Sequence, residues 1–120
     1  MSDPAQESIL VLDQDQNDLE TCGRQLRSFG YRSLMADALE DALRLLNSET
    51  PVLLLVDIVS LAEWGSKVWR SVHNGARQTS VIVLARMADI DAAVAAVKEG
   101  ASFYLLKPVS LDHLIETFII

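Results

Sequence analysis

The sequence predicts a single-domain α/β fold, in which helices cover both faces of a five-stranded parallel sheet. Two observations support this fold class. Short apolar runs alternate with amphipathic stretches five times along the 120 residues, and such alternation gives parallel strands joined by helical crossovers. The strongest runs are continuously apolar, as expected of strands buried on both faces. Because the crossovers are right-handed and the sheet is open, the predicted architecture is doubly wound.

The first half of the chain contains three predicted strands and two predicted helices. The strands are expected at residues 9–12, 31–35 and 52–56, of which the last is the strongest apolar run. Gly30 is expected to end the first helix, and Asp37 to cap the start of the second. Spacings of three and four residues predict the inward faces of the two helices as Leu19, Cys22, Leu26 and Phe29, and as Leu39, Leu43 and Leu46.

The second half continues the alternation. A third helix is expected over residues 62–73, and strands over residues 80–85 and 102–106. Gly100 is expected to end the fourth helix, and Ser110 to cap the fifth. The predicted inward residues are Val68, Trp69 and Val72 on the third helix, and Ile90, Val94 and Val97 on the fourth.

The composition limits the classes of function that the chain can have. Its net charge of −7 disfavours direct nucleic-acid binding, which needs a basic face. A single cysteine excludes an internal disulfide. Residues 1–7 are expected to form a tail without the features of a signal peptide, and the apolar runs are far shorter than the ~20 residues that span a bilayer. We therefore expect one cytoplasmic domain at residues 8–120, without membrane contact.

Charged and polar residues follow the predicted strands, at the edge of the sheet where doubly wound folds bind ligands. They are Asp13, Gln14 and Asp15 after the first strand, Asp57 after the third, Ala85 and Arg86 after the fourth, and Lys107 and Pro108 after the fifth. A carboxylate can attack a phosphoryl group, a divalent ion held by carboxylates can neutralise phosphoryl oxygens, and a lysine can pair with them. Asp57, Asp13 and Lys107 can fill these roles.

The same segments resemble the receiver domain of two-component response regulators. "ILVLDQD" is similar to that family's first strand with its acidic pair, and "LLLVDIVSLAEWG" to its phosphoacceptor segment, with Gly65 eight residues after Asp57. "GASFYLLKPVS" is similar to its lysine–proline signature. The resemblance implies a flavodoxin-like sheet of order 2-1-3-4-5. It also implies Asp57 as phosphoacceptor, a cis Lys107–Pro108 bond that aims Lys107 into the site, and Mg²⁺ held by Asp13, Asp57 and the backbone carbonyl of Val59.

Three departures from the family's pattern bear on metal binding and phosphorylation. Gln14 stands in place of the second acid of the pair, which binds Mg²⁺ directly in the family, although its amide remains a candidate ligand. Ala85 stands in place of the Thr or Ser that hydrogen-bonds the phosphoryl group, a bond worth roughly 1.5–3 kcal/mol. Arg86 follows where the family has a small residue. Without a hydroxyl at position 85, the inward swing of the switch aromatic, here Tyr104, is expected to be weak.

These substitutions also change the charge expected in the pocket. Asp13 and Asp57 against Lys107 leave a charge of −1, and an inward-turned Arg86 leaves zero. Mg²⁺ relies on carboxylate charge, so it is expected to bind weakly. Two orientations of Arg86 remain open, one paired with Asp57 and Asp13 and the other facing solvent.

Several other residues have structural interpretations. Asp15 is expected either to replace the missing ligand or to cap the first helix, with Asp18 in its first turn. Cys22 is expected in the core. His73 and His113 are too far apart in the sequence to have the spacing of metal ligands. Trp64 is expected on a loop beside the pocket.

The "DQD" segment has a second resemblance, to the haloacid dehalogenase phosphatases. In that interpretation Asp13 is the nucleophile and Asp15 the acid–base group. It requires a later acidic pair for Mg²⁺ and usually a cap segment, and the sequence supplies neither. It also leaves the spacing from Asp57 to Gly65 and the lysine–proline signature unexplained, so the receiver interpretation is preferred.

Two functions from different classes remain open, and neither is that of an enzyme. In the first, a histidine kinase phosphorylates Asp57, and the face formed by the fourth helix, fifth strand and fifth helix changes its affinity for an output domain or partner. In the second, the same face binds a partner or a second copy without phosphorylation. The chain is expected to end within its last helix, either as a piece of a longer regulator or as a single-domain regulator.

Overall fold

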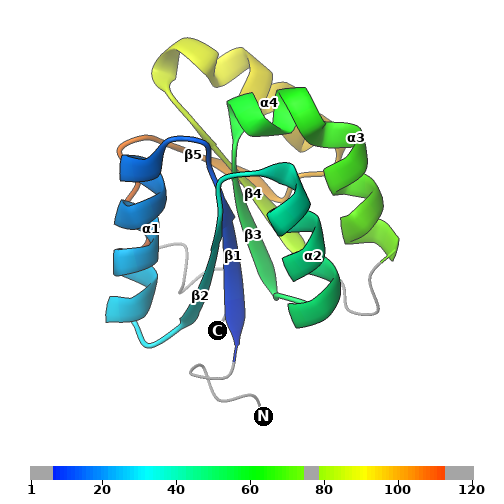
Figure 1. The fold of residues 1–120 in the computed structure, drawn as a ribbon. Coiled ribbons are helices and arrows are strands. Elements are labelled where there is room, and N and C mark those ends of the chain that lie inside the picture. The colour runs from blue at the N-terminus through cyan, green and yellow to red at the C-terminus, as the bar shows by residue number, and fades with distance from the viewer. Residues whose placement is uncertain (1–6, 75–78, 113–120) are drawn as a thin grey trace.

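The architecture is a parallel sheet with helices on both faces (Figure 1), as a computed structural model describes it for residues 7–74 and 79–112. The strands are β1 (Ser8–Leu12), β2 (Arg32–Ala36), β3 (Leu53–Asp57), β4 (Ser80–Ala85) and β5 (Phe103–Leu106). They pair in the order β2-β1-β3-β4-β5, and every neighbouring pair is parallel. The predicted fold class and strand order are confirmed.

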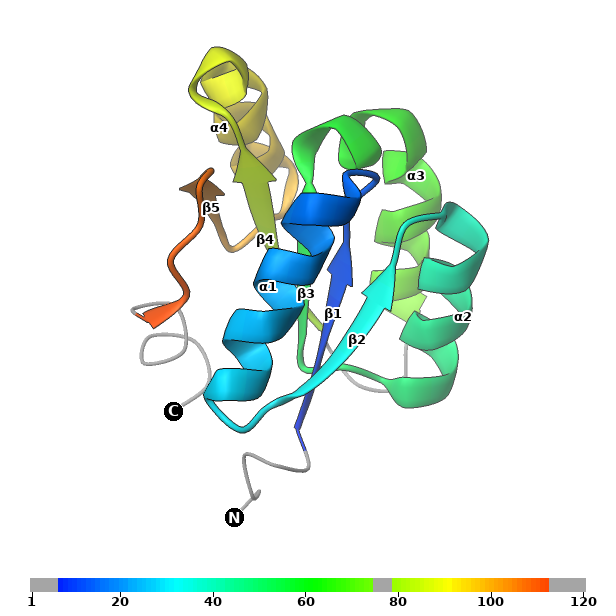
Figure 2. The ribbon, with the colours of Figure 1, turned by 60° about the vertical axis from the view of Figure 1, so that its left-hand side comes forward.

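The helices divide between the two faces of this sheet. They are α1 (Gln16–Ser28), α2 (Leu39–Glu49), α3 (Ile58–Asn74) and α4 (Ile90–Glu99), with a short 3-10 helix η2 (Met87–Asp89) before α4. Helix α1 covers one face, and α2, α3 and α4 cover the other (Figures 1 and 2). The helix expected after Ser110 and the residue His113 lie mainly or wholly outside the described residues. No helix in the described ranges is long and apolar enough to cross a membrane.

Two apolar clusters pack against the two faces of the sheet. Successive side chains of a strand point to opposite faces, so that Ile9 and Val11 join the cluster under α1, whereas Leu10 and Leu12 join the cluster under α2, α3 and α4. All residues of β1 and β3 are buried. Burial on both faces explains why these strands are apolar without alternation.

The inward faces of three helices differ from the prediction. Phe29 is 41% exposed because it lies at the C-cap of α1, beyond the last turn. In α4 the buried positions are Ala93 and Ala96, whereas Val94 is exposed. One residue corresponds to about 100° around a helix, so a pattern read from valines selected a neighbouring face. In α2 the buried residues are Ala42 and Leu46, while Leu43 is only half-buried.

Two helix starts also differ. Helix α2 is preceded by Ala38 as N-cap, while Asp37 instead accepts a hydrogen bond from Gln16. Helix α3 begins at Ile58, directly after β3, and therefore includes Trp64, which was expected on a loop. Trp64 and Trp69 are half-buried and pack against the larger cluster.

The buried thiol of Cys22 is expected to make the free energy of unfolding depend on pH in the alkaline range. Cys22 is buried on α1, as predicted, and burial followed by the nearby Asp13 charge raises the pKa of its thiol from 9.0 to about 11. The unfolded chain therefore loses the thiol proton first, and stability is expected to fall as the pH rises from about 9 towards 11, by an amount of order 1–2 kcal/mol. Urea unfolding at several pH values should give a smaller loss for Cys22→Ala than for the wild type. Equal losses in the two proteins would contradict this assignment.

Candidate functional site

A polar pocket of about 410 Å³ opens at the carboxyl ends of the strands, which all point to one edge of the sheet (Figure 2). Parallel pairing brings the four predicted strand ends together at this edge, because each pair is in register. Its lining residues are Asp13, Gln14, Asp15, Asp57, Val59, Arg86, Asp89 and Lys107. Of the predicted site residues, Ala85, Tyr104 and Pro108 do not line it.

Lys107 is the centre of the charge network in this pocket. Its Nζ lies 2.8 Å from Asp13 Oδ2, 2.8 Å from Asp18 Oδ2 and 2.8 Å from Asp57 Oδ1. The Lys107 side chain is only 9% exposed. Its backbone N–H donates to the Ala85 carbonyl at 2.8 Å, and the Lys107–Pro108 bond is cis, as the family resemblance implied. One ammonium group thus joins carboxylates from β1, α1 and β3.

All four oxygens of the two buried carboxylates already have a partner. For Asp13, the second oxygen accepts the Asp15 backbone N–H at 2.9 Å, and for Asp57 it accepts the Val59 N–H at 3.1 Å. The pKa of Asp13 is raised by burial, against the hydrogen bond from Lys107. Burial acts to lower the pKa of Lys107, but its hydrogen bonds to the carboxylates outweigh burial and raise that pKa. The Lys107 side chain is therefore protonated at neutral pH.

Arg86 lies at the rim and does not reach either buried carboxylate. Its guanidinium lies 3.8 Å from Asp15 Oδ2 and 4.0 Å from Asp18 Oδ2, and its side chain is 66% exposed. Of the two orientations that the sequence left open, the structure shows the solvent-facing one, and Lys107 occupies the position between Asp13 and Asp57. Asp13, Asp57 and Lys107 carry the charge of −1 expected from the sequence for a pocket without Arg86. Asp15, Asp18 and Arg86 around them bring the linked group to a formal charge of −2.

Asp15 is the N-cap of α1. Its side chain accepts the backbone N–H groups of Asn17 and Asp18 at 2.9 and 3.1 Å, and these hydrogen bonds, that of Asp18 first, lower the pKa of Asp15. The capping alternative is therefore supported over a ligand role.

Gln14 is directed towards α3. Its Nε2 donates to Ser60 Oγ and to Glu63 Oε2, each at 3.3 Å, which ties the loop after β1 to the first turns of α3. Val59 lines the pocket from the first turn of α3, and its backbone carbonyl stays a predicted metal ligand.

The donor set fits a weakly held divalent cation. Asp13 and Asp57 supply two carboxylates, whose oxygens keep further lone pairs beside those already used. The third acid is missing, and Lys107 supplies positive charge where an ion needs negative charge. In the described part of the chain, no group of three or more His, Cys, Asp or Glu side chains is arranged to hold a metal.

The predicted switch positions lie behind the pocket. Ala85 is fully buried and has no polar side-chain atom to offer. Tyr104 is half-buried against the larger cluster, with its ring stacked on Phe103 at 5.6 Å between centroids. Pro108 is exposed beside a small neighbouring cavity.

Sequence reasoning missed two residues of the site: Asp89, which lines the pocket, and Asp18. Asp18 was assigned only to the first turn of α1, yet its carboxylate holds Lys107 and faces Arg86. The available signal was its position: a helix that starts at the carboxyl edge of the sheet places its first turn beside the same crevice.

Comparisons with known proteins were consistent with this geometry. The family model described as "Response regulator receiver domain" matches residues 9–119. The transcriptional regulatory protein GlrR of Escherichia coli K12 is 31% identical over 106 residues, which cover 88% of this chain and 24% of that protein. The response regulator MprA of Mycolicibacterium vanbaalenii is 30% identical over 107 residues, with 89% and 46% covered. The chain thus spans a quarter to a half of these curated relatives.

Solved structures show the same likeness. A response regulator from Thermotoga maritima superposes with a TM-score of 0.77 at 28% identity, covering 92% of each chain. A response regulator protein from Burkholderia pseudomallei, solved with a phosphorylated aspartic acid, a calcium ion and citrate, gives a TM-score of 0.78 at 28% identity, with 93% of this chain and 66% of that chain covered.

Proposed function

The chain belongs to the response regulator receiver domain family, and from this membership we propose that Asp57 accepts a phosphoryl group from a histidine kinase. The observation that carries the proposal is the position of Asp57. It is buried at the end of β3, and its Oδ1 lies 2.8 Å from the Lys107 ammonium. A nucleophilic carboxylate beside a fixed cation is the arrangement that phosphoryl transfer to an acid requires.

The proposed step exchanges one phosphorus bond for another. A carboxylate oxygen of Asp57 attacks phosphorus in a phosphohistidine donor, and the bond from phosphorus to nitrogen breaks. The imidazole leaves with the electron pair and takes up a proton from solvent, while Asp57 becomes an acyl phosphate. Lys107 can then pair with a phosphoryl oxygen in place of the carboxylate oxygen that has reacted.

Mg²⁺ is the cofactor expected for this reaction, and Asp13 and Asp57 are the residues that would hold it. When bound, it would neutralise the charge of the phosphoryl oxygens. The Gln14 amide adds no charge to attract the ion, so weak binding is part of the proposal. The phosphorylated aspartic acid and calcium ion of the Burkholderia pseudomallei protein support both roles.

The proposed partners are a histidine kinase and an output domain or separate protein, in the cytoplasm. The output signal would pass through the face that includes α4 and β5, either to such a partner or to a second copy of the chain. GlrR is named as a transcriptional regulatory protein and MprA as a response regulator, which supports a role in regulation without identifying this chain's pathway.

Phosphorylation-independent binding is the second candidate function. It is favoured by Ala85, whose buried methyl group cannot hydrogen-bond a phosphoryl group. Intact-mass measurement after incubation with acetyl phosphate and Mg²⁺ separates the two functions, because only a phosphoacceptor gains a phosphate adduct. A folded chain that gains none from acetyl phosphate or from a panel of phosphorylated histidine kinases would favour the second.

Gln14→Asp is expected to tighten Mg²⁺ binding by about tenfold, or ~1.4 kcal/mol. The change restores a negative charge beside Asp13 and Asp57, and carboxylate charge is what attracts this ion. Titration calorimetry with Mg²⁺ would measure the gain. Asn17→Asp is the matched control, since it adds the same charge at an exposed position outside the pocket lining. Similar gains in the two variants would show that overall charge, rather than ligation at position 14, sets the affinity.

A further inference from the structure

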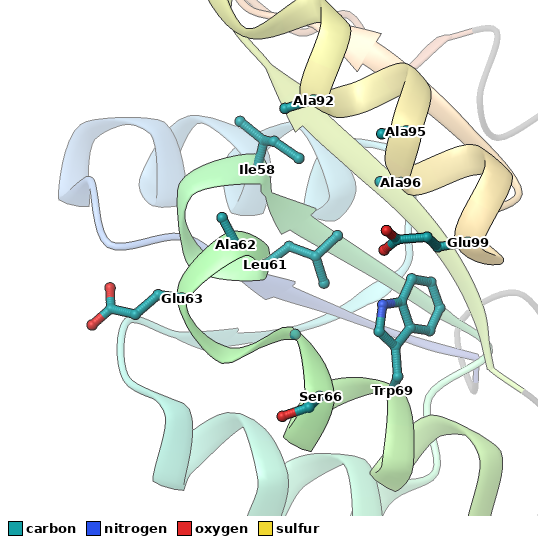
Figure 3. Close-up of a pocket in the computed structure, with 11 residues that line it drawn as sticks. Ile58, Leu61, Ala62, Glu63, Ser66, Trp69, Ala92, Ala95, Ala96 and Glu99 are labelled. Carbon is teal, nitrogen blue, oxygen red and sulfur yellow. The ribbon is translucent and has the colours of Figure 1, made fainter.

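A second cavity lies between α3 and α4, away from the acidic pocket (Figure 3). It is a groove of about 610 Å³, within the size range of pockets that bind ligands and anchor side chains. Helix α3 contributes Ile58, Leu61 and Trp69, and helix α4 contributes Ala92, Ala95 and Ala96. Apart from Glu99 at the end of α4, the α4 residues of the groove are alanines, so the space between the two helices is not filled by long apolar side chains from α4.

The shape of the groove suits a helix. Its α3 wall runs from Ile58 to Trp69, which corresponds to about 16 Å of helix. Short side chains on the α4 wall allow another backbone to approach closely, as in ridge-into-groove packing. Two or three turns of an added helix can therefore lie along the groove, with aliphatic side chains against Leu61 and the alanines.

One end of the groove, formed by Trp69 and Glu99, is chemically complementary to a cation. The Trp69 ring lies beside the end of α4, where a Cβ on Gly100 would be 3.8 Å from it. Figure 3 shows the Glu99 carboxylate next to this ring, and within the described part of the chain Glu99 has no hydrogen-bond or ion-pair partner. An indole beside an unpaired carboxylate is complementary to a guanidinium, which stacks on the ring and pairs with the acid.

We propose that the α3–α4 groove binds a helix of a partner protein that carries an arginine within an aliphatic face. The arginine contacts Trp69 and Glu99, and the aliphatic side chains fill the groove. A second copy of this chain is the less suitable occupant, because each copy carries a net charge of −7. The proposal goes beyond the phosphoacceptor function and does not depend on it.

The test uses the 120-residue chain labelled with ¹⁵N and three synthetic peptides of about 18 residues, or roughly 27 Å of helix. The first peptide has leucine and alanine repeated at helical spacing with one central arginine. The second has glutamate at that position and the third has methionine. No phosphoryl donor is present, so failure here says nothing about phosphorylation of Asp57.

The arginine peptide is expected to shift the Trp69 indole signal and the amide signals of α3 and α4, while the Trp64 indole signal changes less. The methionine peptide should bind at least threefold more weakly, and the glutamate peptide more than tenfold. Equal binding of the arginine and methionine peptides overturns the cationic part of the proposal. Absence of binding by all three at millimolar concentration overturns the docking site.

Three variants localise the effect. Ala95→Leu fills the groove from an exposed position on α4 and should weaken the arginine peptide at least tenfold. Glu99→Gln should weaken it about threefold to fivefold, as for a partly exposed ion pair. Asp91→Asn removes an acid from the same helix outside the groove and should leave the affinity unchanged. Wild-type affinity in Ala95→Leu, or equal losses in Glu99→Gln and Asp91→Asn, contradicts the proposed binding mode.

Discussion

The Asp57→Asn variant is expected to gain no phosphate adduct under conditions in which the wild-type chain gains one. The amide has nearly the shape of the carboxylate but is not a nucleophile towards phosphorus, so the loss should be complete rather than partial. Intact-protein mass spectrometry after incubation with acetyl phosphate and Mg²⁺ gives the result directly. The variant should remain folded, because the amide oxygen can still accept one of the two hydrogen bonds that the carboxylate accepts, and Lys107 keeps its contacts with Asp13 and Asp18.

The control for this experiment is Asp15→Asn. Asp15 carries the same functional group at the rim of the same pocket, but it caps α1 and does not contact Lys107. This variant should still gain the adduct. An adduct that persists in Asp57→Asn would assign phosphorylation to another residue and overturn the role proposed for Asp57. Loss in both variants would point to general damage to the pocket.

Lys107→Met is expected to destabilise the fold by about 3–5 kcal/mol, the usual cost of removing one partner of a buried ion pair. The methionine keeps much of the side-chain stem, so that most of the loss is due to the charge. Without the ammonium group, the buried Asp13 and Asp57 carboxylates face each other with only backbone N–H partners. Urea unfolding at neutral pH, with the midpoint and slope compared between the two proteins, would measure the loss.

Two further measurements test the cause of this loss. Arg86→Met removes a cation from the exposed rim and should cost at most about 1 kcal/mol. The loss in Lys107→Met should shrink as the pH falls, because protonation of Asp13, whose pKa burial already raises, removes the repulsion between the carboxylates. The effect would be assigned to packing if the loss of stability in Lys107→Met did not depend on pH. The same conclusion would follow if Arg86→Met lost as much stability as Lys107→Met.

The sequence was sufficient to predict the strands and the edge at which the site forms. Continuous apolar runs identify β1 and β3 because both faces are covered, and parallel pairing then brings Asp13, Asp57 and Lys107 to the same edge. The lysine–proline motif likewise indicated the side chain that enters the pocket. These conclusions depend on backbone topology, and the alternation of apolar strands with amphipathic helices is sufficient to predict that topology.

The pairing of side chains within the pocket could not be predicted in the same way. Which of several acids a long lysine or arginine contacts depends on distances of a few ångströms across the crevice. Arg86 therefore pairs with Asp15 and Asp18 rather than with the two buried acids. The inward face of α4 was misjudged because hydrophobicity alone does not identify the buried positions. Small alanines can occupy the buried positions while a valine one residue away is exposed.

The position of Lys107 in the chain has a consequence for folding during synthesis. The acids Asp13, Asp18 and Asp57 all precede the cation that they share by at least fifty residues. A nascent chain that has reached β4 therefore contains these three acids before the lysine that pairs with all of them, and the ion pairs that join β1, α1 and β3 cannot yet form. Docking of β5 supplies the ammonium group and completes the sheet in one event. The charge network at this edge is thus completed only when the segment that carries β5 and Lys107 has been synthesised.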